Sequence, residues 1–260
     1  MKIFLKLWER RQLVGLWTLY NIQGRYVETR LGLFWIILQP IVYTIIYSIV
    51  FSNLLLVKPR GGIPFTVFFL SGLTIWELIN SNIMQSSIAL VSKLSLISQS
   101  KFPREIILVV FLCEKIIDFF TTFIILIIIS SYFGIYPTWN YLFLPVYFFA
   151  VFSFLLGVSF IVSSLGVFVR DVDRFVGIGL RFLFYFSGVI FSLDMLPENI
   201  QPILSLNPIL LMVETFRNIV ILNESPNINS LLTLLGLGYL ILVIGYKFFK
   251  SREGTFVDYI

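Results

Sequence analysis

Six long runs of mostly apolar residues restrict what this chain can fold into. A bilayer core about 30 Å thick is crossed by about 20 apolar residues in a helix. The runs occupy residues 33–56, 65–90, 106–133, 141–169, 175–193 and 230–249. The stretch IILIIIS does not alternate as a strand of a membrane barrel would. The sequence therefore predicts an all-α integral membrane protein with six transmembrane helices in a single domain, residues 1–260.

The composition narrows the chemistry open to such a chain. Apolar residues make up 58% of it and charged residues 13%, against about 45–50% and about 25% in soluble domains. With no histidine and a single cysteine, Cys113, we expect no metal site, no catalytic residue and no intramolecular disulfide. There is no G-x-x-x-x-G-K-[ST] loop, so we expect no cofactor in this chain. If transport is active, a partner must bind ATP and Mg.

Basic residues predict the orientation in the membrane. They cluster before the first run, in alternate loops and after the last run: Lys2, Lys6, Arg10, Arg11, Arg25, Arg30, Lys93, Lys101, Arg104, Arg170, Arg174, Lys247, Lys250 and Arg252. The opposite loops carry only Lys58, Arg60 and Arg217. Cytoplasmic loops are enriched in Lys and Arg, so both termini should be cytoplasmic in a bacterial inner (plasma) membrane. The net charge of +5 then suits a membrane surface, and no nucleic-acid partner is expected.

Two segments outside the runs have helical patterns of their own. Residues 1–31 place Trp8, Trp17 and Tyr20 where the headgroup layer would be, which predicts an N-terminal amphipathic interfacial helix. The alternative is a charged tail that only sets the topology. The outer segment 194–229 is too apolar for a soluble lid and is interrupted by prolines, which predicts two short re-entrant helices before the last run.

Polar residues inside the runs are candidate functional groups, because burying them in a membrane is costly. In the second run Glu77, Asn80, Ser81 and Met84 form one helical stripe, which either lines an aqueous path or bonds another helix. The candidates for lining a channel are Trp76, Glu77, Asn80 and Met84. In the third run Lys115 and Asp118 can form an internal ion pair, with a proton relay as the alternative.

Several motifs, in order along nearly the whole chain, resemble one family. They are RYVETRLGLFWIILQPIVYTIIYSIVF, SGLTIWELINSNI, SKFPREI, FVRDVDRFVGIGLRFLFYFSGVIFSLDMLPENI, LNPILLMVETFRNIVI and FVDYI. The pattern resembles the permease subunits of type-2 ABC transporters that export O antigen, capsule or teichoic acid. Two departures are Gln39 in place of the commoner Asn and Ser187-Gly188 in place of Thr-Pro.

The resemblance implies partners and a cargo. Such permeases form a homodimer, bind two ATP-binding cassette subunits and export undecaprenyl-pyrophosphate-linked polysaccharide or a similar glycolipid, here expected to be O antigen. The loop 92–105 would couple to the ATPase through Leu94, Leu96, Ile97, Phe102, Pro103 and Arg104. Together with segment 1–31, Arg25, Tyr26, Arg30 and Trp35 would form a cytoplasmic gate. Arg25 and Arg30 would attract the pyrophosphate there, or would only follow the positive-inside rule.

The resemblance also implies an outer gate in segment 194–229. Its residues would be Asn207, Pro208, Glu214 and Arg217. Arg217 would pair with Glu214 or meet the departing lipid phosphate. Two other functions stay open: an ABC exporter permease for a drug, peptide or lipid, and a membrane glycosyl or acyl transferase. A transferase would need an acidic pair, but Asp171 and Asp173 are flanked by Arg170 and Arg174 and so favour a self-neutralised turn.

Overall fold

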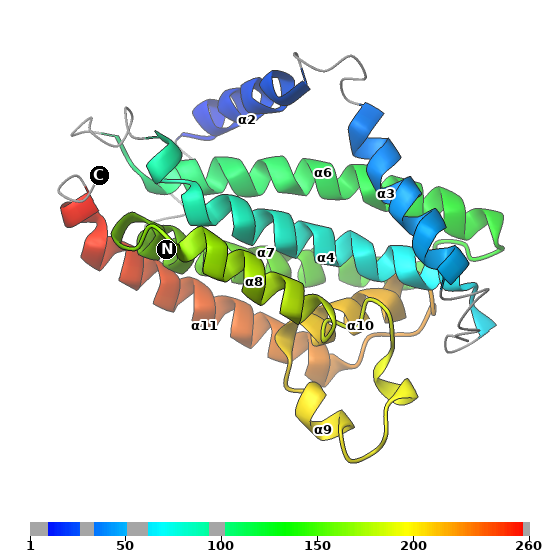
Figure 1. The fold of residues 1–260 in the computed structure, drawn as a ribbon. Coiled ribbons are helices and arrows are strands. Elements are labelled where there is room, and N and C mark those ends of the chain that lie inside the picture. The colour runs from blue at the N-terminus through cyan, green and yellow to red at the C-terminus, as the bar shows by residue number, and fades with distance from the viewer. Residues whose placement is uncertain (1–9, 27–33, 51–61, 94–101, 257–260) are drawn as a thin grey trace.

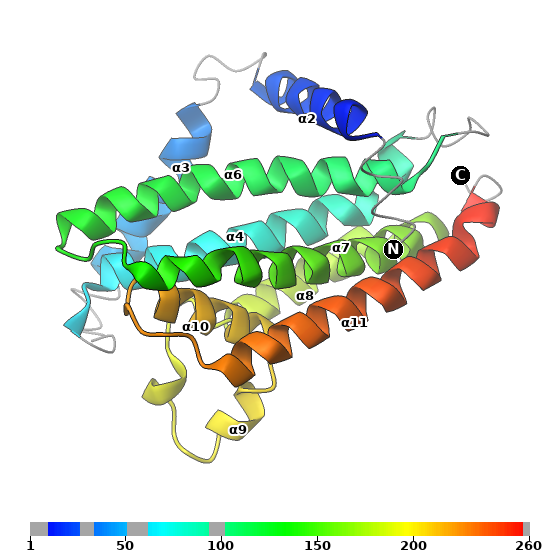
Figure 2. The same ribbon diagram turned by 180° about the vertical axis from the view of Figure 1, so that it is seen from behind.

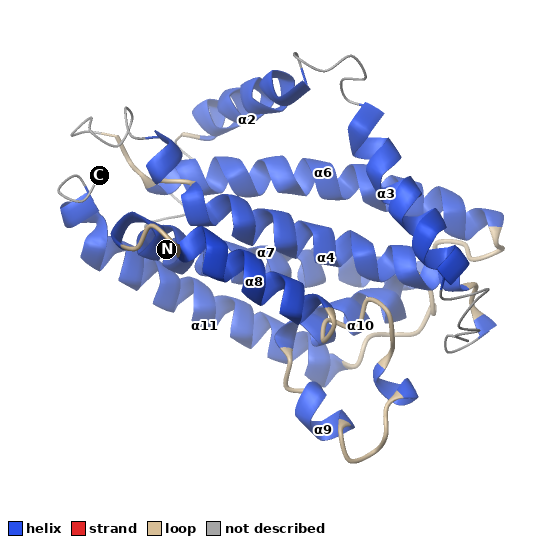
Figure 3. Ribbon diagram, viewed as in Figure 1, coloured by secondary structure: helices blue, strands red, loops and turns tan. Residues whose placement is uncertain are grey.

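The described part of the chain is built from helices. The computed structural model describes residues 10–26, 34–50, 62–93 and 102–256, and no strand occurs in these ranges (Figure 3). The longer helices are α2 (Arg11–Tyr26), α3 (Phe34–Ser48), α4 (Phe65–Ile88), α6 (Glu105–Tyr132), α7 (Leu144–Phe168), α8 (Val172–Phe184), α10 (Pro208–Val220) and α11 (Ile228–Arg252). Short helical turns lie between them: η3 (Val91–Lys93), η4 (Trp139–Phe143), η5 (Leu193–Met195), α9 (Gln201–Leu204) and η6 (Glu253–Thr255). The all-α prediction is confirmed for these residues.

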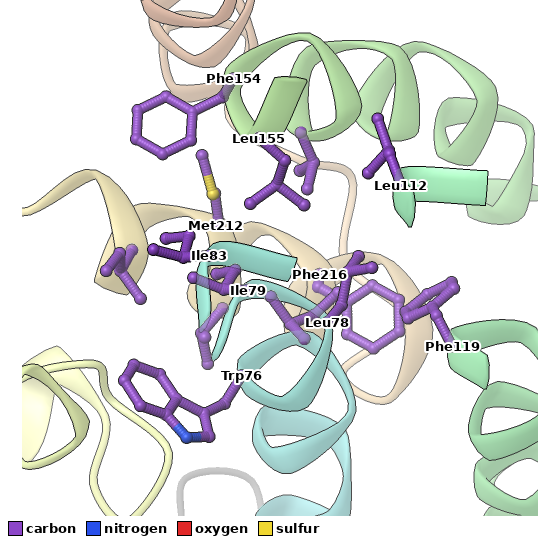
Figure 4. Packing of buried hydrophobic residues seen from close by; sticks show 14 of the residues in the cluster. Trp76, Leu78, Ile79, Ile83, Leu112, Phe119, Phe154, Leu155, Met212 and Phe216 are labelled. Atoms are coloured by element: carbon purple, nitrogen blue, oxygen red, sulfur yellow. The ribbon is translucent and has the colours of Figure 1, made fainter. Parts of the chain in front are cut away.

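Helix α4 lies at the centre of the bundle. It contacts α3, α6, α7, α8 and α10, and most of its side chains are buried (Figures 1 and 2). Figure 4 shows Trp76, Leu78, Ile79 and Ile83 of α4 among side chains of α6, α7 and α10. This buried cluster also contains Leu112, Phe119, Phe154, Leu155, Met212 and Phe216. The second run is therefore the packing centre of the fold.

Helices α7 and α11 pack closely through glycines in their middle parts. A Cβ on Gly245 would lie 2.1 Å from the carbonyl oxygen of Gly157, and one on Gly238 would lie 2.5 Å from that of Ala150. Side chains of any other residue would therefore push the two backbones apart. Small residues at helix contacts are the usual means of close association in membranes, where burial of apolar surface gives little driving force between helices.

Three described helices are long and apolar enough to cross a membrane: Phe65–Ile88, Trp139–Phe168 and Ile228–Thr255. Helix α6 has 28 residues, but Glu105, Glu114, Lys115 and Asp118 all fall in its first half. Helix α3 has 15 residues, and the end of the first run lies outside the described residues. The prediction of an integral membrane protein with apolar helices is confirmed, and the count of six spans stays a prediction.

The predicted helix over residues 175–193 is wrong in its second half. Helix α8 has 13 residues and ends at Phe184, which makes it about 20 Å long. The chain then turns, with Gly188 at φ 78° in the left-handed region. The residues after the turn are apolar, which is why the sequence pattern continues past the end of the helix. Their backbone carbonyls point instead at Arg217, as described below.

The outer segment contains two short helices, as its pattern predicts. Pro202 and Pro208 fall in the first turns of α9 and α10, where the missing N–H of proline costs no helical hydrogen bond. Helix α10 is largely buried against α4, whereas α9 projects from the body of the molecule (Figure 1). Whether the two helices re-enter a membrane stays a prediction.

Candidate functional site

Two adjoining cavities lie along one side of α4. The first, about 250 Å³, is lined by residues of α2, α3, α4 and α6, and the second, about 390 Å³, is lined by residues of α3, α4, α8 and the residue after α8. Tyr43 of α3 and Glu77 of α4 line both cavities. These shared residues make the two cavities one candidate site with differently lined halves.

The polar stripe of α4 faces this site. Most side chains of α4 are buried, whereas Glu77, Asn80 and Ser81 are only partly buried. Each of the three lines at least one cavity. Met84, the last residue of the stripe, lies near Gly177 of α8 and does not line either cavity. The geometry agrees with the interpretation that the stripe borders a polar space.

A second set of polar residues on α4 forms hydrogen bonds to another helix, which is the other role considered for the stripe. The hydroxyl of Ser159 on α7 donates to the side-chain amide oxygen Oδ1 of Asn82 at 2.9 Å, and the hydroxyl of Ser86 donates to Ser159 Oγ at 2.8 Å. All three residues are buried. The sequence analysis missed Asn82 and Ser86, because their partner is more than 70 residues away and carries no local signal.

The second cavity has an aromatic lining. Its rings come from three places in the chain: Tyr43, Tyr47, Trp76, Phe184 and Tyr185. Trp76 and Phe184 are in edge contact, with ring centroids 5.4 Å apart. Glu77, Asn80 and Arg181 add hydrogen-bonding groups to the same wall. Aromatic faces carry negative charge density that attracts C–H groups, and polar groups beside them can bind hydroxyls. Such a lining suits sugar rings.

The first cavity has a charged wall where α2 meets α6. Arg25 pairs with Asp118 at 2.9 Å and with Glu114 at 3.2 Å, and Lys115 pairs with Asp118 at 3.4 Å. Asn21 also donates to Glu114, at 2.7 Å. The two cations and two carboxylates balance, which lowers the cost of placing charges among apolar helices. In the part of the chain that the structure describes, no three His, Cys, Asp or Glu side chains gather as a metal site would require.

The predicted Lys115–Asp118 pair is confirmed. Arg25 lies closer to Asp118 than Lys115 does, at 2.9 Å against 3.4 Å. The sequence analysis treated Arg25 as a group of the cytoplasmic gate and gave it no protein partner. Its two carboxylate partners are 89 and 93 residues away in the sequence. Arg25 thus lies in the wall of the first cavity. Its two ion pairs anchor the end of α2 to the middle of α6.

The structure describes two of the other residues predicted for the cytoplasmic gate. Tyr26 is the last residue of α2, Trp35 is exposed in the first turn of α3, and Arg30 lies outside the described residues. One face of α2, with Trp17 and Asn21, turns toward α6. The helix also exposes four apolar side chains: Leu13, Leu16, Leu19 and Tyr20. These exposed apolar side chains agree with a helix that lies at a membrane surface.

The predicted coupling residues fall in two groups. Leu94, Leu96 and Ile97 lie outside the described residues. Phe102, Pro103 and Arg104 are half-buried just before α6, which begins at Glu105. The ring of Phe102 meets that of Trp17 in α2, with centroids 6.0 Å apart. The end of the predicted coupling loop therefore contacts α2 as well as α6.

The predicted outer-gate residues hold the start of α10 and the turn after α8 together. Asn207 caps α10 by accepting from the Ile209 N–H at 3.0 Å, and its amide donates to the Phe186 carbonyl at 2.8 Å. Pro208 begins α10. Glu214 accepts from the Leu193 N–H at 3.2 Å. A gating role for this group stays a prediction.

Arg217 is buried at the centre of that region. Its guanidinium donates to four backbone carbonyls, those of Gly188 (2.6 Å), Val189 (2.8 Å), Phe191 (3.1 Å) and Phe68 (3.2 Å). It also donates to the Ser71 hydroxyl oxygen at 3.3 Å, and it lies over the Phe68 ring, 3.6 Å from the centroid. Its predicted partner Glu214 is 3.9 Å away. These contacts place Arg217 as a structural anchor between α10, α4 and the turn after α8.

Helices apolar and long enough to cross a membrane, beside cavities with charged and aromatic walls, are the features of an integral membrane protein. The family described as ABC-2 type transporter matches residues 12–221, and the chain belongs to this family.

Curated relatives match along almost their whole length. The chain is 26% identical over 240 residues to the O-antigen export system permease protein RfbA of Klebsiella pneumoniae, covering 92% of this chain and 91% of the relative. It is 22% identical over 241 residues to the protein of the same name from Myxococcus xanthus, with the same coverage. It is also 26% identical over 242 residues to the polysialic acid transport protein KpsM of Escherichia coli, covering 90% and 91%.

Proposed function

We propose that this chain is the membrane-spanning permease subunit of an ATP-driven exporter that moves a lipid-linked polysaccharide, O antigen, from the cytoplasm across the inner membrane. The observation that carries the proposal is the aromatic and polar lining of the second cavity. The names of the relatives from Klebsiella and Myxococcus point to the same cargo. The chain performs no covalent chemistry on its substrate.

The proposed assembly contains two copies of the chain and two ATPase subunits, which bind ATP and Mg. The loop 92–105 docks on the ATPase, and closure of the ATPase pair shifts the helices that follow it. The carrier is undecaprenyl pyrophosphate or a similar lipid, and its phosphates are bound at Arg25 and Arg30. Arg25 pairs with a different carboxylate through each terminal nitrogen, and phosphate oxygens would take the place of these two carboxylates as acceptors.

Removing rings from the lining tests the cargo proposal. Tyr43 and Tyr185 are exposed residues that line the aromatic cavity, so truncating them removes contact surface without opening the core. In a strain that lacks its own copy of the gene, the double variant Tyr43→Ala/Tyr185→Ala should lower the rate of surface display of O antigen about tenfold, since each ring contact is worth about 0.5–1.5 kcal/mol. Tyr43→Phe/Tyr185→Phe should retain most of that rate.

The matched control is Ile45→Ala/Phe182→Ala, which changes exposed residues of α3 and α8 that do not line either cavity. Its display rate should equal that of the wild type. Normal display of O antigen in the strain without the gene would refute the proposed function. Equal losses in the ring variant and the control would refute the role of the aromatic lining.

The proposed topology has six spans, cytoplasmic termini and two re-entrant helices at the outer face. In a Cys113→Ser background, Lys2→Cys and Arg252→Cys should react with a membrane-impermeant thiol reagent only after the cells are opened. Ser225→Cys, in the exposed loop before α11, should react in intact cells whose outer membrane has been permeabilised. Labelling of either terminal position in those cells would contradict the topology.

A further inference from the structure

Two motifs about 145 residues apart in the sequence meet at one end of the bundle. The first is Phe102-Pro103-Arg104-Glu105, at the end of the predicted coupling loop, and the second is the end of α11 with Phe256. The start of α6 and the end of α11 lie at the same end of the bundle in both views (Figures 1 and 2). Nothing in the proposed cavities explains why these residues interact.

Ion pairs and a hydrogen bond join the two motifs. Lys250 pairs with Glu105 at 3.2 Å and with Glu253 at 2.6 Å, and Arg104 donates to the backbone carbonyl of Glu253. The side chain of Glu105 is 4% exposed. Removing the charge of Lys250 would therefore leave a buried carboxylate without this cation, which costs more free energy than breaking an exposed pair.

Aromatic packing extends the same contact to α7. Phe256 is fully buried, with its ring 5.9 Å from that of Phe168 at the end of α7 and 5.4 Å from that of Phe249 in α11. The guanidinium of Arg104 lies 5.9 Å from the Phe256 ring centroid, and that of Arg252 lies 5.7 Å from the Phe168 ring centroid. We call Arg104, Glu105, Lys250, Glu253 and Phe256 the C-terminal clasp.

We propose that the C-terminal clasp transmits movement of the coupling loop to α11 and α7, so that its members are positioning residues for transport. The proposal rests on the proposed function, because it needs an ATPase that moves this loop. A displaced loop pulls directly on α4 and α6, which it joins, and on α2 through Phe102, and it reaches α11 only through contacts at the start of α6. The clasp fastens α11 to that same point, and α11 is in backbone contact with α7 through glycines. Closely packed groups pass on a displacement that a flexible connection would absorb.

The test uses the complete complex of this chain with its ATPase, reconstituted in vesicles with glycolipid. Lys250→Met keeps an apolar stem but removes the ammonium. The variant complex should assemble and hydrolyse ATP within about twofold of the wild type, while glycolipid exported per ATP falls about tenfold. Lys247→Met is the control, since Lys247 is exposed one turn earlier on α11, and its ratio should be unchanged. A purely structural role would lower the amount of complex but not this ratio.

Two further variants keep the proposal testable if Lys250→Met does not accumulate. Arg104→Gln removes the contact with Glu253 from the α6 side and should lower the same ratio. Glu105→Lys combined with Lys250→Glu puts a cation back between two carboxylates and should recover at least about threefold of the ratio lost in Lys250→Glu alone.

Four outcomes would overturn the proposal. The first is a wild-type ratio of glycolipid exported per ATP in both Lys250→Met and Arg104→Gln. The second is no recovery of that ratio when Glu105→Lys is combined with Lys250→Glu. The third is a loss in Lys247→Met equal to that in Lys250→Met. The fourth is loss of ATPase binding in the clasp variants, which would make the cluster part of the docking surface. A wild-type complex that exports no glycolipid would refute the proposed function instead, and the two failures are thereby distinguished.

Discussion

Arg217→Ala should lower the free energy of unfolding by about 3–5 kcal/mol, the cost of removing one partner from a buried charged network. The guanidinium is 1% exposed and is the donor to carbonyls of Phe68, Gly188, Val189 and Phe191. Without it these acceptors stay buried with fewer donors, which costs about 1–3 kcal/mol for each group left unsatisfied. The turn after α8 should detach from α4, and thermal unfolding in detergent should begin at a clearly lower temperature.

Two variants separate the anchor from a general loss of charge. Arg217→Lys keeps the cation but presents a single nitrogen, which cannot reproduce the fork that serves Gly188, Val189 and Phe68 together, so it should recover only part of the stability. Arg174→Ala breaks an exposed pair with Asp171 and should change stability by no more than about 0.5 kcal/mol. An Arg217→Ala protein as stable as Arg174→Ala would show that the contacts of Arg217 are dispensable.

Gly245→Val should separate α7 from α11. The new Cβ would lie 2.1 Å from the carbonyl oxygen of Gly157, a backbone atom that cannot turn aside. Overpacking costs about 1–3 kcal/mol and sometimes more, and we expect the upper end here because both contacting atoms belong to rigid helices. The amount of folded protein in the membrane and its midpoint of thermal unfolding should both fall.

Gly236→Val is the matched control for this change. It is the same substitution in the same helix, but a Cβ at Gly236 would meet nothing within 4 Å. Valine is also a better helix former than glycine, so this variant should be at least as stable as the wild type. If the two variants unfold at the same temperature, close packing of α7 on α11 is not what limits stability.

Local patterns in the sequence predicted the helices and some of their faces. Run length and the absence of alternation predicted helices that correspond to α4, α6, α7 and α11, because the i to i+4 hydrogen bonds of a helix join near neighbours. The spacing of Glu77, Asn80 and Ser81 predicted a common face, and they do border the candidate site. Prolines predicted the breaks around α9 and α10 for the same local reason.

Which side chains meet was decided by tertiary structure alone. The pairs of Arg25 with Asp118 and of Lys250 with Glu105 join residues 93 and 145 positions apart, and the aromatic lining gathers rings from three helices. No periodic signal records such contacts. The end of α8 is a similar case. The apolar pattern continues beyond Phe184, but the helix ends there and the carbonyls of the following turn accept hydrogen bonds from Arg217, which is distant in the sequence. The sequence by itself determined where most of the long helices form, since their hydrogen bonds are local. Packing determined the site, since it depends on which helices lie side by side.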